Sequence, residues 1–153
     1  LAHPAFVDGS RLREFDVVLA NPPYSIKTWN REAFINDKWG RNFLGTPPQG
    51  RADYAFFQHI LASMDDKTGR CAILFPHGVL FRDEEQSMRE ELIKLDYLDC
   101  VVGLGPNLFF NASITEIIVA AKGFSNIKSK KVTKLFALIL FRFILRIASL
   151  IFK

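Results

Sequence analysis

The amino-acid sequence predicts an α/β fold with a mostly parallel sheet and a closing antiparallel hairpin. Three observations predict it. Short apolar runs end at proline or glycine, as buried strands do. Two segments between these runs repeat apolar residues every three or four positions, as helices do. The last two runs are joined by a stretch without a helical pattern, so we expect those strands to pair directly.

The first strand is expected at Phe15–Ala20, where an unbroken apolar run indicates burial. It ends at the tetrapeptide Asn21–Tyr24 (NPPY), because prolines cannot continue a strand ladder. Residues 25–49 then show no sustained period and mix two tryptophans with glycines and prolines. We expect a structureless loop there, and loops of this length are often functional.

A helix is expected from Asp53, whose side chain can cap the N-terminus, to the aspartates and glycine of residues 65–69. Cys71–Phe75 (CAILF) is expected to be a second buried strand. A further helix begins at Asp83, where a glutamine three positions later resembles a capping box, and runs to about Leu95. These elements continue the alternation of strand and helix.

The last two strands are expected at Leu98–Gly103 and Thr115–Ala121. No helix fits between them, which predicts the antiparallel hairpin. Functional groups in such sheets gather at the carboxyl ends of strands. Asn21–Tyr24 lies at such an end and is therefore the first candidate site.

The NPPY tetrapeptide has the groups needed to hold a planar amine. The amide oxygen of Asn21 and the carbonyl oxygen of Pro22 can accept both protons of an –NH2 group, and Tyr24 offers a face on which a ring can stack. Holding these protons out of plane would return part of the lone pair to the nitrogen, so that a sulfonium methyl donor could react in line. The alternative is an ordinary turn, in which Asn caps and Pro fixes the exit.

Charge divides the chain near residue 123. Residues 1–122 carry 13 Lys/Arg and 16 Asp/Glu, whereas residues 123–153 carry seven Lys/Arg and no acid. The overall charge of +4 thus belongs to the tail and does not indicate that the globular part binds nucleic acid. We expect a partial catalytic domain at 1–122 and a basic apolar tail at 123–153.

Two arginines, Arg142 and Arg146, interrupt the apolar part of this tail. Each costs roughly 2.5–3.5 kcal/mol near the centre of a bilayer, so no stable membrane span is expected. Contact with a membrane through a basic amphipathic helix stays possible. The abrupt loss of acidic residues favours a third explanation, a shifted reading frame that leaves an unselected tail.

The segment FDVVLANPPY resembles the catalytic motif of amino-group methyltransferases that use S-adenosylmethionine. WGRNFLGTPPQGRADYAFFQHILASM, GRCAILFPHGVLFR and VVGLGPNLFFNASITEIIVAAK resemble the methylation subunit of type I restriction-modification systems. The resemblance covers about residues 3–122 in unbroken order. It implies methylation of the N6 amine of adenine in DNA, on a base flipped out of the duplex. It also implies a cytoplasmic protein with DNA and the specificity and restriction subunits as partners.

The same resemblance implies the roles of individual residues. Asn21, Pro22, Pro23 and Tyr24 would be catalytic, with Asn21 and Pro22 holding the amino group and Tyr24 stacking on the adenine. Arg51 is a further candidate for substrate binding, because the basic residues of the loop could contact DNA phosphates. Solvated loop charges are the alternative for Arg51 and for its neighbours Lys27, Lys38 and Arg41.

Members of this family bind S-adenosylmethionine through a glycine-rich turn upstream of the NPPY motif. Only one glycine, Gly9, occurs among the 20 residues that precede Asn21. We therefore expect the C-terminal half of a Rossmann-like methyltransferase domain, with its cofactor-binding residues unknown. The strand Phe15–Ala20 would expose an apolar edge, and the chain would be inactive by itself.

Two other functions stay open. Methyltransferases that act on a protein glutamine or an RNA base amine also use this tetrapeptide, although the long matching segments after residue 39 argue against them. A non-catalytic chain that only binds partner subunits is the other alternative. No metal site is predicted, since the three histidines and two cysteines lack metal-ligand spacing. Cys71 and Cys100 are expected to be free thiols.

Overall fold

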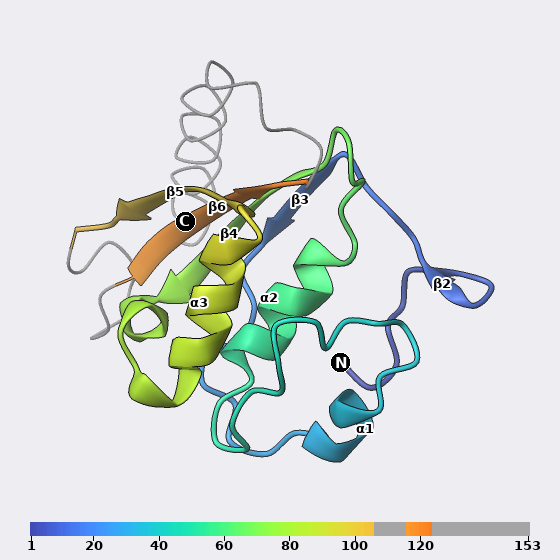
Figure 1. Cartoon of the computed structure of the whole chain (residues 1–153), viewed down its shortest axis with the longest axis horizontal. Coiled ribbons are helices and arrows are strands. Elements are labelled where there is room, and N and C mark those ends of the chain that lie inside the picture. Colours follow the sequence, from blue (N-terminus) through green and yellow to red (C-terminus); the bar gives the residue numbers. More distant parts are fainter. Residues whose placement is uncertain (106–115, 124–153) are drawn as a thin grey trace, which may run out of the picture.

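A four-stranded sheet organises the described part of the chain, which comprises residues 1–105 and 116–123 of the computed structural model (Figure 1). The strand order is β3-β4-β6-β5. The strands of this sheet are β3 (Val17–Ala20), β4 (Arg70–Pro76), β5 (Leu98–Gly103) and β6 (Glu116–Lys122). A separate ribbon pairs β1 (Val7–Asp8) with β2 (Arg11–Leu12).

The strand directions confirm the α/β prediction. β3 is parallel to β4, and β6 is antiparallel to both β4 and β5. Strands β3, β4 and β5 therefore run in one direction, and β6 alone among the strands of this sheet is reversed. The predicted antiparallel pairing of β5 and β6 is present, and β6 lies between β4 and β5. The connection between them, at 106–115, and the predicted tail after residue 123 lie outside the described residues.

Strand β3 lies at an edge of the sheet, which corrects the prediction that it is buried. Val17 is 53% exposed and Leu19 is 38% exposed, whereas Val18 and Ala20 pack against the core. The strand also begins two residues later than expected, because Phe15 forms only an isolated bridge to Met64. The apolar run thus leaves the exposed apolar edge that we expected.

Two helices cover one face of the sheet. Figure 1 shows α2 (Asp53–Leu61) and α3 (Gln86–Lys94) on the same side of it. Alternate residues of β4 and β6 pack with these helices in the main core, which includes Phe57, Ile73 and Val119. The residues between them on β4 and β6 point to the opposite face and are also buried. Burial on both faces explains why CAILF is continuously apolar.

Neither predicted helix cap is present. Asp53 is the first residue of α2 and makes no capping hydrogen bond, since Ala52 occupies the N-cap position. A 3-10 turn, η2 (Asp83–Glu85), precedes α3, so that Asp83 is too far from the helix to cap it. The carboxylate of Asp53 is instead used in tertiary contacts described below.

Residues 25–49 are not structureless. They contain the short helix α1 (Arg31–Ile35), whose N-cap Asn30 accepts a hydrogen bond from the Ala33 amide at 3.0 Å. The fully buried Gln58 of α2 accepts from the Leu44 amide at 2.7 Å and donates to the Gly45 carbonyl at 2.9 Å. The Gln58 side chain therefore satisfies loop backbone groups that have no helix or strand partner. These contacts explain why the loop is ordered although its sequence shows no period.

Arg41 is buried, which excludes both the solvated and the phosphate-contacting roles considered for it. Its side chain is 1% exposed and forms an ion pair with Asp37, which is 2% exposed. The guanidinium also lies over the rings of Phe34 and Trp39 and within 3.4 Å of Nδ1 of His59. Burial, with the charge of Arg41, lowers the pKa of His59 to about 4.

The depressed pKa of His59 predicts acid lability. The unfolded chain takes up a proton on this residue near pH 6.5, whereas the folded chain does so only near pH 4. As the pH is lowered from 6.5 to 4, this difference should decrease the free energy of unfolding. In His59→Gln the part of the decrease that His59 causes should be absent. Urea titrations across this range would measure it. His3→Gln, at an exposed histidine, is the control, and an unchanged pH profile in His59→Gln would contradict the prediction.

Candidate functional site

The NPPY loop leaves the carboxyl end of β3, as predicted. Ala20 pairs with Ile73 of the parallel strand β4, so the loop begins beside the middle of that strand. Pro22 is buried, whereas Asn21 and Pro23 are exposed. Burial of Pro22 thus anchors the loop while the Asn21 side chain is presented to solvent.

Tyr24 turns back to Asn21. Its hydroxyl donates a hydrogen bond to Oδ1 of Asn21 at 3.0 Å. The half-buried ring packs on the face of the sheet opposite the helices, against a small apolar cluster: Ala72, Leu74, Leu104 and Ile118. Burial, followed by the nearby charge of Glu116, raises the pKa of Tyr24. The hydroxyl therefore keeps its proton at neutral pH and remains a donor.

The exit of the loop is fixed by Asp53. Ser25 adopts a positive φ of 49°, and its amide donates to Oδ1 of Asp53 at 2.7 Å. Arg82 donates to Oδ2 of the same carboxylate at 2.7 Å and lies 3.3 Å from Oε2 of Glu85. Asp53 and Glu85 are 1% and 0% exposed. This network joins the loop, the first turn of α2 and the start of α3.

Gly78 makes room for the same network, because it has no side chain. A Cβ atom there would come within 2.8 Å of the Arg82 guanidinium. The 3-10 turn that contains Gly78, η1 (His77–Leu80), follows β4 directly. The glycine two residues after the end of β4 therefore leaves the space that Arg82 occupies.

Sequence reasoning missed Asp53, Arg82 and Glu85 as a unit. From the sequence, Asp53 is predicted only as a helix cap, and Arg82 and Glu85 are not singled out. A charged residue among apolar neighbours, as in RADYAFF and VLFRDEE, was the available signal. It could not show that three separate segments meet, because that depends on the tertiary fold.

Glu116 is a second residue that sequence reasoning missed. It opens β6 opposite Pro76 and is 6% exposed. Burial raises its pKa. Among the described residues its Oε2 atom has no hydrogen-bond partner. The signal was a single acid at the head of the apolar run TEIIVAA.

Three other residues, Arg51, Asp16 and His77, contact side chains outside the NPPY loop. Arg51 pairs with Glu84 at 3.5 Å, and both side chains are well exposed, so its role in substrate binding stays a prediction. Asp16, which lies just before β3, accepts a hydrogen bond from the Thr68 hydroxyl. His77 packs on Phe81, with ring centroids 4.7 Å apart.

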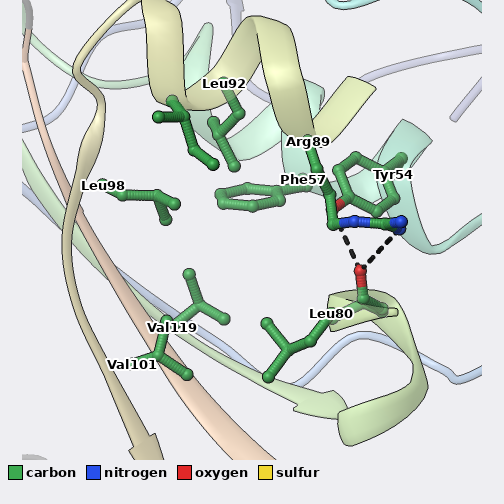
Figure 2. Close-up of a pocket in the computed structure, with 10 residues that line it drawn as sticks. Tyr54, Phe57, Leu80, Arg89, Leu92, Leu98, Val101 and Val119 are labelled. Carbon is green, nitrogen blue, oxygen red and sulfur yellow. Dashed lines mark hydrogen bonds between the residues drawn. The ribbon is translucent and has the colours of Figure 1, made fainter. Parts of the chain in front are cut away.

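The pocket of about 150 Å³ in Figure 2 is separate from the NPPY loop. It is mainly apolar, and its two polar side chains, Arg89 and Tyr54, both donate to the carbonyl of Val79. Within residues 1–105 and 116–123, no His, Cys, Asp and Glu side chains gather into a group that could hold a metal ion. None of the helices in that part of the chain is long and apolar enough to span a membrane.

The mixed sheet with its polar loop at the end of β3 is the fold of S-adenosylmethionine-dependent methyltransferases. A Listeria monocytogenes protein assigned to class I of these enzymes superposes with a TM-score of 0.59 over 78% of this chain and 34% of its own, at 15% identity. The type I restriction-modification methyltransferase subunit of Streptococcus thermophilus gives a TM-score of 0.66 at 39% identity, over 72% of this chain and 24% of that one.

The chain belongs to the N-6 DNA methylase family, whose model matches residues 1–136. The methylase subunit of the Haemophilus influenzae type I restriction enzyme HindI is 31% identical over 109 residues, which are 69% of this chain and 24% of that protein. The chain thus spans about a quarter of the length of such relatives. The family match continues past residue 122, where we predicted the domain to end.

The Asp53 network predicts a specific loss of stability. In Asp53→Asn, the Arg82 guanidinium loses the closer of its two charged partners, and hydrogen bonds to charged groups contribute about 1.5–3 kcal/mol each. We expect the free energy of unfolding in urea to fall by about that amount. Glu84→Gln breaks the exposed pair with Arg51 and should cost at most about 1 kcal/mol. Equal losses in the two variants would contradict the assignment.

Proposed function

We propose that this chain carries the amine-binding part of an adenine-N6 DNA methyltransferase, the methylation subunit of a type I restriction-modification system. The observation that carries the proposal is the exposed amide of Asn21, oriented by Tyr24 at the carboxyl end of β3. Family membership supports DNA as the substrate. The match over residues 1–136 also extends far beyond the NPPY motif.

In this proposal the chain orients the amine and supplies no strong base. Oδ1 of Asn21 and the carbonyl oxygen of Pro22 accept its two protons, and the lone pair of the nitrogen then points away from both acceptors. Pro22 is held by burial, so the acceptor pair is rigid before the base arrives. Rate enhancement would come from orientation rather than from proton transfer.

S-adenosylmethionine is the proposed methyl donor, on the basis of the family. When bound, it supplies an electrophilic methyl group. We assign no residue of this chain to it. The exposed side chains of Val17 and Leu19 belong to β3, the strand that leads directly into Asn21.

DNA and the specificity and restriction subunits are the proposed partners, and a cytoplasmic location belongs to the same proposal. Relatives named as type I methylase subunits support these assignments. Methylation of a protein glutamine or an RNA base amine is the alternative activity. A chain that only binds its partner subunits is the non-catalytic alternative.

Binding of adenine tests the acceptor role of Asn21. Asn21→Ala should weaken the binding of an adenine-containing oligonucleotide by about two- to tenfold, the equivalent of one hydrogen bond. The substitution should not change the binding of an oligonucleotide in which the adenine is replaced by purine, which lacks the exocyclic amine. Asn36→Ala, at another exposed asparagine, is the control. An equal loss of affinity for both oligonucleotides in Asn21→Ala would contradict the proposal.

Methyl transfer identifies the substrate class. Radiolabelled S-adenosylmethionine would be incubated with the chain and, in turn, with adenine-containing DNA, RNA and a glutamine peptide. Label on the N6 atom of DNA adenine supports the proposal and overturns the expectation that the chain alone is inactive. Label on RNA or on the peptide would establish the alternative activity instead.

A further inference from the structure

The acceptor that the proposed function requires is already engaged. Oδ1 of Asn21 accepts the hydroxyl proton of Tyr24 at 3.0 Å. An amide oxygen has two lone pairs, but a hydrogen bond to one weakens its capacity to accept through the other. A bound amine would therefore be held more firmly if the Tyr24 proton had another acceptor.

Glu116 has the position of that second acceptor. Its side chain lies on the same face of β6 as Ile118, since residues two apart in a strand share a face. Tyr24 packs against that face. The carboxyl of Glu116 is close enough for a side-chain hydrogen bond with the Tyr24 hydroxyl, and its charge raises the pKa of Tyr24. The Tyr24 hydroxyl thus has two acceptors within reach, Asn21 and Glu116.

One carboxyl oxygen of Glu116, Oε2, lacks a partner among the described residues. Glu116 is 6% exposed, and its Oε2 atom has no hydrogen-bond partner within residues 1–105 and 116–123. The neighbouring amide of Leu104 donates to the backbone carbonyl of Glu116 and not to its side chain. A buried acceptor without a donor is costly, so a proton from Tyr24 would remove that cost.

We propose that Glu116 is a positioning residue, to which the Tyr24 hydroxyl donates when an amine occupies Oδ1 of Asn21. The exchange needs only rotation of the hydroxyl proton about the bond between the ring and its oxygen. The ring keeps its place on the sheet, and the full acceptor strength of Asn21 becomes available. The inference rests on the proposed function only for the identity of the amine.

The first test needs no substrate. In the chain labelled with carbon-13 at the ζ position of tyrosine, the exchange rate of the Tyr24 hydroxyl proton reports its hydrogen bonding. Asn21→Ala removes one acceptor, and we expect the rate to stay within about threefold of the unmodified chain because Glu116 takes over. Adding Glu116→Met should raise the rate about tenfold, the equivalent of one hydrogen bond.

The controls keep this test decisive. The double variant Asn21→Ala with Glu116→Gln should restore slow exchange, because a glutamine retains an acceptor oxygen. Tyr54, whose hydroxyl donates to the Val79 carbonyl, gives the internal reference. Fast exchange in Asn21→Ala alone would overturn the proposal, and this result does not depend on whether Glu116→Met folds.

A second test separates positioning from a structural role. Glu116→Met should weaken binding of the adenine oligonucleotide about three- to tenfold in the chain with Tyr24, and have no effect in the Tyr24→Phe background. Equal losses in both backgrounds would show a structural role and overturn the proposal. If the unmodified chain binds no adenine, the proposed function fails, and the hydroxyl exchange rates still decide the role of Glu116.

Discussion

The carboxylate of Asp53 is the constraint on which the rest of the candidate site depends. One oxygen holds the Ser25 amide just after the NPPY loop, and the other holds Arg82. Arg82 also pairs with the buried Glu85, which precedes α3. A single buried anion thus fixes the loop relative to both helices, so that the loop geometry follows from the packing of the whole core.

This constraint explains how a short loop at a sheet edge can be rigid. β3 pairs with only one strand among the described residues and exposes half of its apolar side chains. An edge strand by itself would hold a functional loop poorly. The Tyr24 ring on the far face of the sheet and the Asp53 carboxylate on the helix side compensate, and Pro22 between Ala20 and Tyr24 is buried.

The sequence predicted the order of strands and helices because apolar period and proline positions are local signals. It placed Asn21–Tyr24 at the end of a strand for the same reason. It did not predict that Arg41 is buried, that residues 25–49 are ordered by Gln58, or that Glu116 lies beside Tyr24. Each of these depends on contacts between segments far apart in the chain, which spacing along one segment does not encode. The apolar run of β3 indicated burial, and only the family resemblance predicted the exposed apolar edge that the strand has.

The central claim is that the loop at the end of β3 holds an amine between two fixed acceptors. The most direct measurement is a crystal structure of the chain soaked with 9-methyladenine. The account predicts the exocyclic nitrogen within hydrogen-bond distance of both Oδ1 of Asn21 and the carbonyl oxygen of Pro22, with the ring stacked on Tyr24. A base bound at this loop with its amine turned away from Asn21, or bound only elsewhere on the chain, would contradict it.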